Sequence, residues 1–144
     1  MKKCKDVMTQ NPVCCLPTDT VSKAAQLMKD EDVGSIPVIE DEETMKLIGI
    51  VTDRDLALQV VAPQRDPGST QVEDVMTYEV ITCRAGDDVQ KAVDAMAQHQ
   101  LRRMPVIDAD HRIVGIISQA DVATRVEKSE EVAEMVKEIS QPTA

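Results

Sequence analysis

The chain has 144 residues, a formal net charge of −10, one Tyr and neither Phe nor Trp. Folding at this length buries roughly 68–70% of the unfolded chain's surface, which suffices for one domain or two small halves with an aliphatic core. An acidic surface repels nucleic acid, aromatic side chains for base stacking are lacking, and no apolar run approaches the roughly 18 residues that span a bilayer. We therefore expect a cytoplasmic protein with neither a nucleic-acid nor a membrane partner.

One segment of the sequence occurs twice. Asp-Val-Met-Thr stands at 6–9 and again at 74–77, an offset of 68 residues, and Pro-Val-Ile recurs at the same offset. The offset then falls to 66 across a polar stretch, because loops tolerate changes of length. The predicted domains are repeat 1 at 1–62, a linker at 63–71, repeat 2 at 72–126, and a C-terminal helix and tail at 127–144.

Each repeat predicts the order strand, helix, strand, strand, helix. An apolar stripe of helical period follows Thr20 in repeat 1 and Asp87 or Asp88 in repeat 2, and we expect these residues to cap the helices. The last strand is apolar on both faces, which favours a central place in the sheet. The fold class is α/β (α+β), with two tandem β-α-β-β-α repeats packed through their sheets by a pseudo-twofold axis. The predicted strands are 13–16, 36–39, 47–51, 80–83 and 113–117.

The remaining segments indicate packing more than chemistry. Residues 127–139 have one apolar helical face, which packs on its own domain or helps to form a dimer interface. The four cysteines show neither a C-x-x-C pair nor zinc-ligand spacing, so we expect small buried side chains, with thiol redox chemistry as the alternative. His99 and His111 are expected at the surface.

Two stretches, 49–55 and 115–121, combine polar groups where a buried strand runs into a helix. Each has a hydroxyl at the junction, from Thr52 or Ser118, and an Asp three residues later. A helix start offers free backbone N–H groups, and these, the hydroxyl and the carboxylate suit a phosphorylated ribose. The same pattern is typical of a capping box, in which hydroxyl and carboxylate satisfy each other's backbone donors.

These features together resemble a tandem pair of cystathionine-beta-synthase-type (CBS) domains, the arrangement called a Bateman module. The resemblance rests on the two Asp-Val-Met-Thr motifs, on the segments 34–39 and 102–107, and on the two junction stretches, and it covers about 6–126. No catalytic, channel or transporter domain is attached, so the chain looks like a stand-alone CBS-pair protein.

The resemblance implies a regulatory module that binds an adenosine-containing ligand in a cleft between the repeats. The ligands implied are AMP, ADP, ATP, S-adenosylmethionine or NAD. In such modules the Asp of each junction binds ribose hydroxyls, and the Thr or Ser contacts phosphate or ribose. Carried over by position, the ligand-binding residues implied are Thr52 and Asp55 in one cleft and Ser118 and Asp121 in the other.

The residue before the apolar-Pro pair faces the phosphates in this family, which implies roles for Ser35 and Arg103. Arg102 and Arg103 together favour phosphate binding in the second cleft, although surface ion pairs with neighbouring carboxylates are the alternative. The base would be contacted by apolar side chains, unless these belong simply to the core. The apolar candidates are Ile36, Ile81 and Met104.

Three classes of function remain open at this point. The first is a homodimeric sensor of an adenine nucleotide that passes a change of shape to an effector protein, whose identity the sequence does not give. The second is a ligand-free structural or stress-associated interaction module. An enzyme is disfavoured, since no nucleophile–base pair, metal spacing or phosphate-binding loop is evident, so we expect no catalytic residue, no metal and no required cofactor.

Overall fold

The computed structural model describes residues 2–125, which divide into two compact units. Within the described residues, unit 1 comprises 2–12 and 81–125, and unit 2 is Val13–Val80. The units therefore differ from the sequence repeats. The leading segment of each repeat, 2–12 in repeat 1 and 72–80 in repeat 2, packs with the remainder of the other repeat. The predicted tail helix at 127–139 lies outside the described residues.

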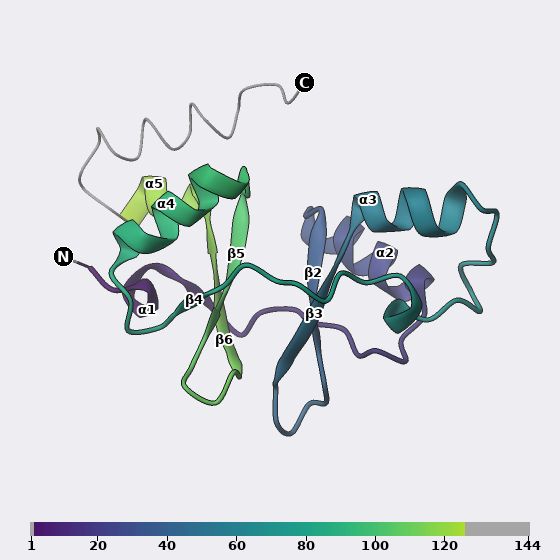
Figure 1. Ribbon diagram of the computed structural model, residues 1–144, viewed down its shortest axis with the longest axis horizontal. Helices are drawn as coiled ribbons and strands as arrows, with labels where there is room; N and C mark the ends of the chain where they lie inside the picture. The colour runs from purple at the N-terminus through teal and green to yellow at the C-terminus, as the bar shows by residue number, and fades with distance from the viewer. Residues whose placement is uncertain (1, 126–144) are drawn as a thin grey trace. The chain divides into compact units, whose positions relative to one another are not determined.

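Unit 1 is built on a four-stranded sheet in the order β1-β6-β5-β4 (Figure 1). Strand β6 lies between β1 and β5 and is antiparallel to both, whereas β4 runs parallel to β5. The expected central place of the apolar last strand is thus confirmed in this unit. Its elements are α1 (Cys4–Val7), β1 (Thr9–Gln10), β4 (Cys83–Arg84), α4 (Val89–His99), β5 (Arg103–Ile107), β6 (Ile113–Ser118) and α5 (Gln119–Arg125).

Unit 2 repeats this plan with shorter edges. Its two-stranded sheet is an antiparallel hairpin of β2 and β3, and single bridges from Thr77 to Ile50 and from Cys15 to Val38 stand where unit 1 has β1 and β4. Its elements are α2 (Val21–Glu31), β2 (Ser35–Ile39), β3 (Leu47–Thr52), α3 (Asp53–Leu56), the π-helix η1 (Ala57–Val61) and the 3-10 helix η2 (Val72–Asp74). The mixed α and β content agrees with the expected fold class.

The two long helices begin at the predicted residues but are capped differently. The Thr20 hydroxyl accepts the Lys23 N–H at 3.1 Å, which satisfies one of the orphan donors of α2. Asp88 is the N-cap of α4, yet its side chain makes no cap hydrogen bond and pairs instead with Lys3. Each helix turns its apolar stripe into the core of its own unit.

The predicted strands at 13–16 and 80–83 are wrong in extent. Only Cys15 of the first pairs with β2, by donating to the Pro37 carbonyl at 3.0 Å and by accepting the Ile39 N–H at 3.0 Å. To extend this parallel pairing toward Val13, the backbone N–H of residue 37 would have to donate the next hydrogen bond. In unit 1, extending β4 toward Ile81 would need the same from residue 105. Proline has no N–H, so the pairing stops there in both units.

Each unit has a core of its own that is aliphatic, as the composition predicts. Val, Ile, Met, Ala and Cys side chains supply the buried clusters, and no polar side chain of the described residues is fully buried. Among residues 2–125, none of the helices has the length and apolar character that crossing a bilayer requires. His99 and His111 are both exposed, as expected.

Candidate functional site

The two strand-to-helix junctions are capping boxes. In unit 1 the Asp121 N–H donates to Ser118 Oγ at 3.0 Å, while Asp121 Oδ2 accepts the Ser118 N–H at 3.2 Å. In unit 2 Thr52 and Asp55 make the same reciprocal pair, at 3.0 Å in both directions. The capping alternative is therefore present at both sites. All four side chains are half-buried, so the carboxylates still face solvent on one side.

A third side chain joins each junction, and the sequence pattern did not single it out. The Thr9 hydroxyl donates to Asp121 at 3.2 and 3.4 Å, and the Thr77 hydroxyl donates to Asp55 at 3.3 Å to either oxygen. Both threonines end an Asp-Val-Met-Thr motif. Each therefore comes from the repeat that does not supply the Asp, so the exchange of leading segments completes both junctions.

The glycines that precede the junctions admit these exchanged segments. A Cβ atom on Gly115 would lie 2.5 Å from Met8 Sδ and 2.9 Å from the Thr9 carbonyl oxygen. A Cβ atom on Gly49 would lie 2.9 Å from the Thr77 carbonyl oxygen. Only a residue without a side chain allows such close approach of two backbones, which explains the Gly in each Gly-to-Asp stretch.

Hairpin register brings the predicted phosphate contacts beside the junctions. Arg103 pairs with Ser118 across β5 and β6, and Ser35 pairs with Thr52 across β2 and β3. Arg103 is half-buried and Arg102, before it, is exposed. The predicted polar residues therefore do gather at one end of each hairpin.

The expectation of free N–H groups at the helix start fails largely in unit 1, where Gln119 N–H donates to the Arg102 carbonyl at 2.8 Å and Asp121 N–H donates to Ser118 Oγ at 3.0 Å. It is wrong for unit 2. There Asp53 N–H donates to the Gly34 carbonyl at 2.9 Å, Arg54 N–H to Asp53 Oδ1 at 2.8 Å, and Asp55 N–H to the Thr52 hydroxyl. The first N–H groups of α3 are occupied by the protein's own acceptors. A phosphate at this junction would have to be met by side chains.

The two junctions differ in charge. In unit 2 the Asp53 carboxylate lies against Gly34, close enough that a Cβ there would be 3.0 Å from Oδ2. In unit 1, Gln119 stands in place of Asp53 and Arg102 in place of Gly34. Unit 1 therefore has an uncharged amide instead of the carboxylate, and a guanidinium where unit 2 has no side chain. Unit 2 carries Arg54 where unit 1 has Ala120, but the Arg102–Arg103 pair still gives unit 1 the more cationic junction.

Two of the three apolar candidates belong to the cores. Ile36 is 1% exposed in the unit 2 core, and Met104 is 0% exposed in the unit 1 core. The adjoining prolines are also buried. Ile81 is 37% exposed and lies before β4, so it is the one candidate open to contact. Within residues 2–125, no group of three His, Cys, Asp or Glu side chains is arranged to hold a metal ion.

Known proteins share this architecture. The family model for the CBS domain matches residues 4–61 and 72–128. The CBS domain-containing protein YhcV of Bacillus subtilis is 38% identical over 140 residues, which is 97% of this chain and 96% of that protein. Crystalline Hypoxic Response Protein I, which contains two coordinated zinc ions, matches with a TM-score of 0.76 at 32% identity, over 87% of this chain and 99% of that chain.

Two further solved structures hold adenosine compounds. CBSX2 in complex with AMP matches with a TM-score of 0.73 at 27% identity, over 95% of this chain and 99% of that chain. The CBS domain pair of MJ0100, in complex with 5′-methylthioadenosine and S-adenosyl-L-methionine, matches with a TM-score of 0.71 at 26% identity, over 86% of this chain and 94% of that chain. The repeated hairpins, the Gly-to-Asp junctions and these matches over nearly the whole sequence agree, and the chain belongs to the CBS-domain family with two copies of the domain.

Proposed function

We propose that this chain is a regulatory module that binds an adenosine-containing ligand of the AMP, ADP or ATP class. The observation that carries the proposal is the unit 1 junction, where the Ser118–Asp121 pair lies beside Arg103. Support also comes from the similar chains that hold AMP or S-adenosyl-L-methionine. Catalysis forms no part of the proposal, and neither does a required cofactor.

Asp121 is suited to a ribose because its carboxylate is fixed but not saturated. Two ionised oxygens offer about four acceptor sites. Ser118 N–H and the Thr9 hydroxyl use part of this capacity, and they hold the carboxylate in one orientation. The remaining sites can accept the two hydroxyls of a ribose. Asp55, held by Thr52 and Thr77, offers the same acceptor geometry in unit 2.

Phosphate recognition falls to Arg103 in this proposal, and to Arg102 as its neighbour. A guanidinium presents a planar set of donors that matches phosphate oxygens. Unit 2 has Ser35 at the position of Arg103 and carries Asp53 nearby, so the proposal gives it a weaker affinity for a phosphorylated ligand. The Asp53 carboxylate would not repel an uncharged or cationic adenosyl compound as it repels a phosphate.

Calorimetric titration with AMP and ATP tests the role of Arg103. Arg103→Ala is expected to weaken binding by at least about tenfold, since a charge-assisted hydrogen bond contributes roughly 1.5–3 kcal/mol. Arg112→Ala is the matched control, because it removes the same charge from the turn at the opposite end of the same hairpin. Equal affinities for the two variants would refute the phosphate role of Arg103.

The ligand-free interaction module is the second candidate, and the exposed face of unit 2 favours it. Leu58 is 50% exposed and Val61 is 72% exposed on η1. Val61 also lines an apolar groove of about 250 Å³, whose other lining residues are Val21, Ala25, Leu56, Val60, Gln64, Arg65 and Pro67. Exposed apolar side chains along a groove are typical of an interaction surface.

We propose a homodimer that covers this face, which is compatible with either candidate function. Size-exclusion chromatography with light scattering should then give twice the mass of one chain. Val61→Glu should lower that mass toward one chain, whereas Gln59→Glu, an exposed neighbour on η1 with the same added charge, should leave it unchanged. A wild-type mass of a single chain would exclude the dimer. The effector protein and the cytoplasmic location stay predictions from the sequence.

A further inference from the structure

The N-terminal segment is fastened directly beside Cys83 in unit 1. Cys4 N–H donates to the Asp87 carbonyl at 2.9 Å, and Lys5 N–H donates to the Ala85 carbonyl at 3.0 Å. Both acceptors lie in the turn that follows Cys83 on β4. Two cysteines 79 positions apart in the sequence are therefore held next to each other.

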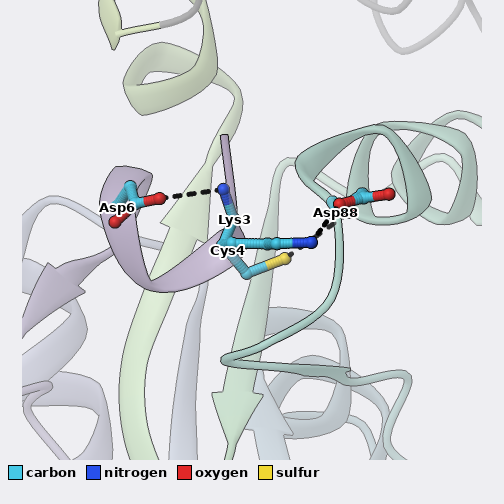
Figure 2. Close-up of polar contacts among 4 residues, drawn as sticks. All are labelled: Lys3, Cys4, Asp6 and Asp88. Atoms are coloured by element: carbon cyan, nitrogen blue, oxygen red, sulfur yellow. Dashed lines mark hydrogen bonds and ion pairs between the residues drawn. The ribbon is translucent and has the colours of Figure 1, made fainter. Parts of the chain in front are cut away.

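Cys4 and Cys83 lie in the same buried cluster. Both side chains belong to the unit 1 core, with exposed fractions of 0% and 4%. Figure 2 shows the Cys4 sulfur directed toward Asp88, whose carbonyl oxygen is 3.9 Å away. The neighbouring Cys83 thiol lowers the pKa of Cys4, while the Cys4 thiol and burial raise the pKa of Cys83.

Unit 2 shows that packing does not require a thiol at the position of Cys4. Its equivalent there is Val72, which is also fully buried and whose N–H donates to the Asp19 carbonyl at 2.8 Å. Cys15 of unit 2 takes the place of Cys83. The same backbone arrangement thus accepts a small aliphatic side chain, and of the two equivalent places among the described residues it is the one in unit 1 that pairs two cysteines from distant parts of the sequence.

We propose that Cys4 and Cys83 form a reversible thiol–disulfide pair that hydroperoxides oxidise. The Cys4 thiolate attacks a peroxide oxygen, the O–O bond breaks, and Cys4 sulfenic acid and water are formed after protonation of the leaving hydroxide. The Cys83 sulfur then attacks the Cys4 sulfur, and the S–O bond breaks with loss of a second water that takes the Cys83 proton. The sulfur atoms together lose two electrons, and one hydrogen peroxide becomes two waters.

The disulfide connects oxidation to the candidate ligand site of unit 1. It fixes the segment that carries Thr9, whose hydroxyl orients Asp121. The corresponding segment of unit 2, with Thr77, has no such link because Val72 stands in place of Cys4. Since the pair is buried, oxidation is limited by local opening of the N-terminal segment, which makes it slow rather than absent.

Peptide mapping of the full chain after hydrogen peroxide treatment tests the pair without any nucleotide. The expected product lacks two hydrogen atoms and contains a peptide that links Cys4 to Cys83, which dithiothreitol separates. The midpoint of thermal unfolding of the oxidised chain should exceed that of the reduced chain by about 10 °C, because the disulfide bond closes a long loop. Cys4→Val, which copies unit 2, should give no linked peptide, whereas Cys15→Val should give the same link as wild type.

Val72→Cys provides a second check in unit 2. It recreates the pair beside Cys15, and peroxide should then form a second linked peptide. The proposal is overturned if the wild-type chain keeps the Cys4 and Cys83 thiols under peroxide that oxidises Cys14, or if the linked peptides join other cysteines. Binding of AMP plays no part in these readouts, so they stand apart from the ligand proposal.

Discussion

Gly115→Ala is the most informative single perturbation of the fold, since it acts where the exchanged segment meets β6. The added Cβ would lie 2.5 Å from Met8 Sδ, 2.8 Å from Met8 Cγ and 2.9 Å from the Thr9 carbonyl oxygen. The Met8 side chain can rotate away, but the Thr9 carbonyl is fixed by pairing of Thr9 with Ile116. The strands must therefore separate by a few tenths of an ångström.

The expected cost is about 1–3 kcal/mol. Overpacking of a well-packed site costs typically about 1–3 kcal/mol, and weakened strand hydrogen bonds add about 0.5–1.5 kcal/mol each. Replacing Gly by Ala also restricts the unfolded chain, which offsets about 0.4–1 kcal/mol. Urea unfolding followed by far-ultraviolet circular dichroism measures the difference, and this probe is needed because the chain has no Trp.

Gly86→Ala is the matched control for the same chemical change. No atom lies within 4 Å of a Cβ built there, and its φ is not positive, so the variant should be neutral or more stable by up to about 1 kcal/mol. In a Met8→Ala background the cost of Gly115→Ala should shrink, because part of the clash is removed. If Gly115→Ala and Gly86→Ala unfold at the same urea concentration, the close approach described here is refuted.

Three further predictions concern the cores, a helix end and pH. Met104→Ala should cost about 2–5 kcal/mol of unfolding free energy, because its side chain is fully buried, whereas Ile81→Ala should cost under about 0.5 kcal/mol; similar costs would remove Met104 from the core. Gln100→Gly should stabilise α4 by up to about 1 kcal/mol because Gln100 has φ 54°, while Gln98→Gly inside the helix should destabilise; a loss of stability in Gln100→Gly would contradict this. Burial, with the nearby Asp19, raises the pKa of Cys15 to about 12, so its contribution to stability is complete below about pH 9 and declines toward pH 12 as the unfolded thiol ionises first. Burial also raises the pKa of Cys14, to about 11, so Cys15→Val should make the alkaline decline in urea titrations less steep without abolishing it, and an unchanged decline would exclude a contribution from Cys15.

Local signals in the sequence predicted most of the secondary structure. Thr20 caps α2 as expected, since a hydroxyl before an apolar stripe satisfies a helix donor wherever the helix packs. The hairpin of β2 and β3 follows from two apolar runs joined by a polar turn. The short β4 was overestimated because the missing N–H of Pro105 acts on the neighbouring strand, which a pattern within one segment does not reveal.

The exchange of leading segments could not be predicted, because the two repeats have the same motifs. Gly49 and Gly115 each accept a Met-Thr segment, and the sequence alone would allow either copy to fill either place. The same ambiguity concealed Thr9 and Thr77, which appeared only as marks of the repeat. The polar residues at the junctions were predicted, whereas the burial of Ile36 and Met104 depends on packing that the strand pattern leaves open.

A ligand panel read by thermal unfolding tests the central proposal most directly. AMP, ADP, ATP, NAD and S-adenosylmethionine would each be added to the full chain, since a ligand at about 100 times its dissociation constant stabilises by about 2.7 kcal/mol. We predict that at least one adenosine phosphate raises the midpoint, and that Asp121→Asn loses this gain while Asp110→Asn, an exposed residue of the distant turn in the same unit, keeps it. An unchanged midpoint with every compound would contradict the sensor function and favour the ligand-free interaction module.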